Sequence, residues 1–205
     1  MTNTISAETA PDLACVLTAR PVEGPFALDE RLKRSDLRRD LATGAEADGV
    51  PLRLRMTLQR VDGGARTPLA GAVVEVWHCD ATGAYGDGVL HGYQVTGADG
   101  VAEFATTYPG WYPTRAVHLH FRVRVEDGGA QPREAMSELF FDEASARAVH
   151  ERSPYSAKGQ PDTPNHTDCV YTTLSAGEQA GLTVRATQAA DGGYDAHVTL
   201  GVRLS

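Results

Sequence analysis

Two histidines, His118 and His120, stand in the segment HLHFRVRV, in which polar and apolar residues alternate. Successive side chains of a β-strand point to opposite faces. In a strand the two histidines would share one face, about 6.6 Å apart along the chain, with Leu119 and Phe121 on the other face. Because neutral imidazole is a common metal ligand, the pair suggests a metal centre.

Two tyrosines, Tyr85 and Tyr112, precede this strand, and Tyr112 lies in a turn stiffened by two prolines (PGWYP). An unperturbed tyrosine has a pKa near ~10, so only a hard, highly charged cation such as Fe(III) keeps phenolate ionised at neutral pH. Two phenolates would also favour the oxidised state of iron. Arg115, three residues before His118, could offer its guanidinium to a charged intermediate.

Size and charge exclude several classes of protein. The chain has 205 residues, 41% of them hydrophobic and 22% charged, as in a soluble single domain. Its net charge of −8 argues against a nucleic-acid partner, because phosphate binding needs a basic surface. The absence of an apolar run of 18 residues argues against a membrane span.

The N-terminal residues MTNTISAETAPDLACVL lack the basic and apolar regions of an export signal. We therefore expect a cytoplasmic protein; a secreted protein whose leader has been trimmed is the alternative. Cys15, Cys79 and Cys169 are too scattered for a disulfide framework or a zinc site. We interpret them as free thiols, with a Cys15–Cys169 bridge as the alternative.

Short alternating segments separated by glycine-rich turns predict an all-β fold, an antiparallel β-sandwich with long loops. The expected strands cover residues 52–61, 72–77, 93–96, 101–107, 117–125, 136–141, 169–174, 181–187 and 194–203. One helix is expected over 142–151, with Asp142 as its N-cap. Residues 1–49 are interpreted as an irregular N-terminal arm packed on the core, and 50–205 as the β-sandwich catalytic domain.

Six segments carry a family resemblance: GPFALDERLKRSDL, PLAGAVVEVWHCDATGAY, GYQVTGADGVAEFATTYPGWYPTR, HLHF, SELFF and PNHTDCVY. They span about residues 23–173 and occur in the family's order. The chain resembles the intradiol ring-cleavage dioxygenases, close to their short, extracellular-dioxygenase-like or protocatechuate 3,4-dioxygenase-like branch. The resemblance implies a β-sandwich with non-haem iron at one side.

The resemblance also assigns roles to residues. Tyr85, Tyr112, His118 and His120 match the four ligands of a non-haem Fe(III). Arg115, beside the substrate, and Tyr112, which an incoming catechol displaces, would be catalytic. The implied activity inserts both atoms of O2 into a catechol-type diol and cleaves the ring between the two hydroxyl-bearing carbons. The product is a cis,cis-muconate-type diacid, and the implied role is the catabolism of aromatic compounds.

Two residues depart from the family's pattern near the expected substrate pocket. Glu138 stands where the family usually has glutamine, and His91 stands where it usually has arginine. Both changes make the pocket less positive, so we expect a neutral catechol to be preferred over a carboxylated one such as protocatechuate. Catechol, hydroxyquinol and bulkier diols remain open as substrates. Sandwich edges and the N-terminal arm make a homodimer plausible.

Two other functions fit parts of the pattern. The first is another metal enzyme built on the two histidines, a cupin-type Fe(II) oxygenase or a copper protein, for which Glu138 is the candidate carboxylate. The second is a non-enzymatic β-sandwich that binds a carbohydrate or a protein. The remaining aromatic and histidine residues are expected in structural places: His78 in support of the site, Trp77 and Tyr108 in the core, and His150, His166 and His197 on the surface.

Overall fold

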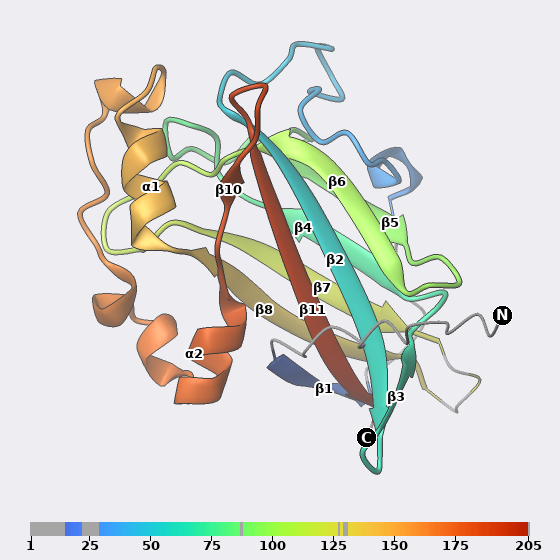
Figure 1. The fold of residues 1–205 in the computed structure, drawn as a ribbon. Helices are drawn as coiled ribbons and strands as arrows, with labels where there is room; N and C mark the ends of the chain where they lie inside the picture. Colours follow the sequence, from blue (N-terminus) through green and yellow to red (C-terminus); the bar gives the residue numbers. More distant parts are fainter. Residues whose placement is uncertain (1–14, 22–28, 87, 127, 129–130, 205) are drawn as a thin grey trace, which may run out of the picture.

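Two β-sheets pack face to face in the computed structural model, which describes residues 15–21, 29–86, 88–126, 128 and 131–204 (Figure 1). The strands are β1 (Cys15–Pro21), β2 (Pro51–Asp62), β3 (Ala65–Pro68), β4 (Val73–Trp77), β5 (His91–Val95), β6 (Val101–Thr107), β7 (His118–Val125), β8 (Arg133–Phe141), β9 (Thr183–Val184), β10 (Thr187–Gln188) and β11 (Tyr194–Leu204). The helices are α1 (Glu143–His150) and α2 (Ala176–Leu182), with short 3-10 turns η1 (Glu30–Leu32), η2 (Tyr155–Ala157), η3 (Asn165–Thr167) and η4 (Tyr171–Thr173).

The sheets are mixed. In one, β2 pairs antiparallel with β3 and β6 but parallel with β11, and β1 lies parallel to β11. In the other, β8, β7, β4 and β5 follow one another in antiparallel pairs, with β9 parallel to β8. The mostly-β fold with two sheets is confirmed, whereas the fully antiparallel arrangement is wrong. Alternation of side chains reports which face is buried and says nothing of strand direction.

Facing strands of the two sheets form the core. On β2 the side chains of Leu52, Leu54 and Met56 are buried, and the residues between them face outward. On β7 Leu119 and Phe121 are fully buried, as the alternation predicts. Each such side chain contributes roughly 1.5–3 kcal/mol to stability. The inward set therefore fixes the register of β7 and sends its histidines to the opposite face.

The described part of the N-terminal segment lies along both sheets. The Arg34 amide donates to Tyr93 O of β5 at 3.1 Å, and the Leu37 amide donates to Ala105 O of β6 at 2.8 Å. The Leu37 side chain is fully buried. Residues 15–21, expected to be irregular, form β1, because their backbone pairs with a strand at the far end of the chain. Residues 1–14, on which the export prediction rests, lie outside the described residues.

Near the C-terminus one expected strand is wrong and another is confirmed only in part. Residues 169–174 contain η4 in place of a strand, and residues 181–187 contain the end of α2 followed by β9 and the start of β10. A capping box formed by Ser175 and Glu178 begins α2, and this signal for a helix start accounts for the helical residues 181 and 182. Helix α1 is confirmed, with the Asp142 side chain accepting from the Ser145 amide.

The structure also tests the expectations for individual aromatic, histidine and cysteine residues. Tyr108 is fully buried, as expected, and all three cysteines are free, so no Cys15–Cys169 bridge forms. Trp77 is half-buried rather than part of the core. His150, expected on the surface, is 1% exposed, because it lies on the inner face of α1 against the Tyr155 ring. No helix among the described residues is long and apolar enough to span a membrane.

A buried histidine makes the fold sensitive to acid. Burial lowers the pKa of His78 from its ordinary 6.5 to about 4. The unfolded chain therefore binds the proton more readily, and the contribution of His78 to stability is lost as pH falls below 6.5. For one group with this shift the loss between pH 7 and pH 5 is about 2 kcal/mol.

We expect His78→Gln to lose less stability than wild type between these pH values in urea unfolding. His166→Gln, at an exposed position, should follow wild type; equal losses in all three proteins would contradict the prediction.

Candidate metal centre

Three segments bring the four expected ligands together. Strand β7 carries His118 and His120 on its outward face, with ring centroids 4.9 Å apart. Tyr85 comes from the β4–β5 loop, residues 78–90, and Tyr112 from the β6–β7 loop, residues 108–117. The rings of the two tyrosines meet edge to face, with centroids 5.9 Å apart. Loops at one end of the sandwich thus complete a site that a strand begins.

Each tyrosine hydroxyl faces one histidine. The Tyr112 Oη atom lies 3.1 Å from His118 Nε2, and the Tyr85 Oη atom lies 3.1 Å from His120 Nε2. Two phenol oxygens and two imidazole nitrogens therefore point into one small volume. This donor set of two oxygens and two nitrogens fits a hard ferric ion.

The other ring nitrogen of each histidine lies close to an oxygen atom. His118 Nδ1 lies 2.7 Å from Ala116 O, and His120 Nδ1 lies 3.3 Å from Glu138 Oε1. Glu138 reaches this place because β8 pairs it directly with His120. In metal sites an oxygen partner at Nδ1 orients the ring and leaves Nε2 for the ion. Both Nε2 atoms are thus oriented toward the tyrosines.

Both imidazoles are in the form that binds metal. Burial, together with the positive charge of Arg115, lowers the pKa of His118 and of His120 to about 4. The rings are therefore neutral at pH 7. Burial also raises the pKa of Tyr85 above its ordinary value, and the hydrogen bond with Tyr112 acts in the same direction. Ionising that phenol consequently requires a nearby cation, which reverses the effect of burial.

Arg115 is held beside the ligands by two carboxylates. Its Nε atom donates to Asp168 Oδ2 at 2.8 Å, and an Nη atom pairs with Glu138. Its other Nη atom lies 3.5 Å from Tyr112 Oη. Asp168, whose side chain is fully buried, also accepts from the Ala116 amide at 2.8 Å. We did not predict a role for Asp168; the only signal was its place in PNHTDCVY, a segment of the family resemblance.

Glu138 and the two histidines form an alternative set of metal ligands. Ligand atoms of His118, His120 and Glu138 lie within 4.8 Å of one another, and they form the one such group of three among the described residues. Two histidines and a carboxylate can hold Fe(II). However, Glu138 faces Nδ1 of His120 and the guanidinium of Arg115, whereas Tyr85 faces Nε2 of His120. The geometry thus favours the tyrosines as partners of both Nε2 atoms.

His91, expected in the substrate pocket, lies on β5. It is two strands away from His120, and Trp77 stands between the two in the register. The Trp77 ring stacks on His120 at 5.1 Å, while His91 Nε2 lies 2.9 Å from Glu75. His91 does line a hollow of about 330 Å³ that Gly86, next to Tyr85, also lines.

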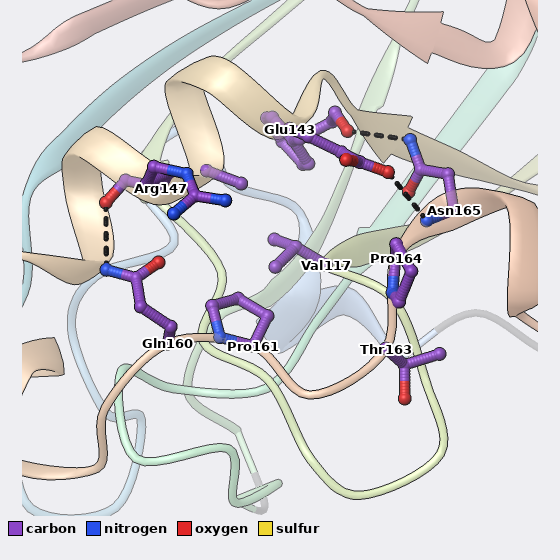
Figure 2. Close-up of a pocket in the computed structure, with 10 residues that line it drawn as sticks. Val117, Glu143, Arg147, Gln160, Pro161, Thr163, Pro164 and Asn165 are labelled. Carbon is purple, nitrogen blue, oxygen red and sulfur yellow. Dashed lines mark hydrogen bonds between the residues drawn. The ribbon is translucent and has the colours of Figure 1, made fainter.

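A separate hollow of about 240 Å³ lies between α1 and the loop that follows η2 (Figure 2). It contains none of the expected ligands. Its walls are joined by hydrogen bonds: the Gln160 amide donates to Arg147 O at 3.2 Å, and the Asn165 amide side chain donates to Phe141 O at 3.0 Å. These contacts fasten residues 160–165 to α1 and to the end of β8.

The sequence comparison and the structural comparison both find dioxygenases. No model of a known protein family matches the chain. A catechol 1,2-dioxygenase from Acinetobacter lwoffii is 32% identical in an alignment 138 positions long, which covers 52% of this chain and 42% of that protein. The match thus spans less than half the length of that relative.

Solved structures extend the match to most of the chain. An intradiol ring-cleavage dioxygenase from Tetranychus urticae has a TM-score of 0.69 and 25% identity, over 90% of this chain and 93% of that one. The resemblance to the intradiol ring-cleavage dioxygenases is confirmed. The dioxygenase domain of a carbohydrate-binding fusion protein from Streptomyces sp. SirexAA-E has a TM-score of 0.60 and 24% identity, over 90% of this chain and 96% of that one. This second likeness, at lower identity, concerns the fold.

Proposed function

We propose that the protein is a non-haem Fe(III) intradiol dioxygenase. The observation that carries the proposal is the pairing of each tyrosine hydroxyl with one histidine Nε2, at 3.1 Å in both cases. Tyr85, Tyr112, His118 and His120 would hold the ion. Bound Fe(III) would act as a Lewis acid that prepares a catechol for reaction with O2.

The chain's own groups divide the remaining work. The Arg115 guanidinium, 3.5 Å from Tyr112 Oη, would offset negative charge that develops on the bound diol. The Tyr112 oxygen would take up a proton from an incoming catechol hydroxyl. Asp168 and Glu138 would keep Arg115 in place, and Glu138 would also keep His120 turned with Nε2 toward the site.

The reaction would insert both atoms of O2 and cleave the ring between the two hydroxyl-bearing carbons, giving a cis,cis-muconate-type diacid in the catabolism of aromatic compounds. Residues 50–205 would form the catalytic domain, with residues 1–49 as an arm. We expect a cytoplasmic protein, a homodimer, and no nucleic-acid or membrane partner.

A neutral catechol is the substrate class that the charges favour. Arg115 is the cation nearest to the ligands, and two carboxylates already pair with it. A further carboxylate on the substrate would therefore meet Glu138 without a free positive charge. Protocatechuate should consequently bind more weakly than catechol.

The visible spectrum of the protein loaded with Fe(III) tests this proposal. We expect a broad tyrosinate-to-iron band that moves to longer wavelength when catechol is added without oxygen. Protocatechuate should cause the same change only at higher concentration. Iron bound without colour would contradict the proposal and favour the Fe(II) site of His118, His120 and Glu138.

A further inference from the structure

The two loops that carry the tyrosines are in direct backbone contact. The Gly110 amide of the β6–β7 loop donates to Asp80 O of the β4–β5 loop at 3.2 Å. A Cβ atom added to Gly83 would lie 1.9 Å from Trp111 O, and one added to Gly110 would lie 2.3 Å from Asp80 O. No side chain fits between the loops at these points. The position of one tyrosine therefore depends on the position of the other loop.

Lys158 bridges the same two loops. Its ammonium donates to Thr82 O of the Tyr85 loop at 2.6 Å and to Trp111 O of the Tyr112 loop at 2.5 Å. The ammonium also lies 4.7 Å from the centroid of the Trp111 ring, within the range of a cation–π contact. An ammonium has three donors and no acceptor, so it suits two carbonyl groups that approach from different loops.

The backbone that presents Lys158 is itself fixed. Tyr155 of η2 is fully buried, and its hydroxyl donates to Tyr108 O at 2.6 Å. The Trp111 indole donates to Gly159 O at 3.0 Å. Beyond Gly159 the chain is fastened to α1 by Gln160 (Figure 2). Residues 155–160 thus form a firm base against the Tyr112 loop, from which Lys158 reaches the Tyr85 loop.

We propose that Lys158 is a positioning residue that holds the Tyr85 loop against the Tyr112 loop. By tying the two backbones together it keeps both phenol oxygens facing the histidines, so that an ion meets a ligand set already assembled. Prior ordering of this kind strengthens binding because the loops need not be ordered when the ion arrives. The effect on iron rests on the proposed function, whereas the contact between the loops does not.

The test compares three variants. Lys158→Met removes the ammonium and keeps most of the stem, Lys158→Arg restores a cationic donor, and Lys33→Met is the control at the chain's other lysine, which is also exposed. In metal-free protein, hydrogen exchange is measured at the amides of Gly83 and Gly110, which both donate to Asp80 O. We expect Lys158→Met alone to exchange faster at both amides, by about tenfold, with β7 unchanged.

Fe(III) titration, followed by the tyrosinate band, gives the second readout. We expect Lys158→Met to bind Fe(III) about tenfold more weakly, the lower end of the effect of removing a supporting partner of metal ligands, and Lys158→Arg to recover most of the affinity. Unchanged exchange in Lys158→Met would overturn the inference whatever the iron result. Faster exchange with unchanged affinity would overturn the positioning role. A wild-type protein that takes up no Fe(III) would overturn the proposed function instead, and the exchange data separate the two failures.

Discussion

Replacing Arg115 with methionine is expected to destabilise the protein by about 3–5 kcal/mol and to remove most turnover. The Arg115 side chain is 13% exposed, and its partner Asp168 is fully buried. Removing the guanidinium leaves Asp168 and Glu138 as close, largely buried negative charges without a cation. The same change removes the positive charge nearest to Tyr112. Urea unfolding measures the first effect, and O2 uptake with catechol measures the second.

Two further variants test whether the loss of stability comes from the buried carboxylates. Arg53→Met also breaks two ion pairs, with Asp191 and Asp195, but its side chain is 47% exposed, so we expect a change of about 1 kcal/mol or less. Adding Glu138→Gln to Arg115→Met removes one of the two stranded charges and should restore part of the stability but no turnover. A loss for Arg115→Met no larger than for Arg53→Met would contradict this arrangement of charges. Additive effects of Arg115→Met and Glu138→Gln in a double-mutant cycle would also contradict it.

The sequence predicted the parts of the site that local pattern controls. Alternation from His118 to Val125 identified a strand with one buried face, because each inward residue must contact the opposite sheet. The same alternation placed both histidines outward together. Tyr85 and Tyr112 could be chosen because each lies in a loop marked by glycine or proline near that strand, and because their order matches the family resemblance.

The features that were missed all depend on contacts between distant segments. Strand β1 exists because its backbone pairs with β11. No pattern within its own residues, CVLTARP, indicates that partner. Asp168 and Lys158 lie in loops that follow α1 in the chain and contact the segments that carry the tyrosines. His150 stands among polar residues in the sequence, yet α1 packs it inward. The local sequence pattern predicts burial and turns. It does not predict which loops will be neighbours in the fold.

The proposed reaction depends on all four proposed ligands. Cleavage between the two hydroxyl-bearing carbons turns each of them into a carboxyl carbon, and each gains one oxygen atom from O2. If His120 is a ligand, His120→Ala removes one of four donors and should lower turnover by at least about 10³-fold, since a bound metal contributes several kcal/mol to such a step. His166→Ala, at an exposed position outside the site, should keep wild-type turnover.

The most direct test is analysis of the product that the iron-loaded protein forms from catechol under ¹⁸O₂. The account predicts cis,cis-muconate with one ¹⁸O in each carboxyl group, formed by wild type and His166→Ala and not by His120→Ala. A semialdehyde from cleavage beside the diol, incorporation of a single oxygen atom, or no O2 uptake by the iron-loaded wild type would contradict it.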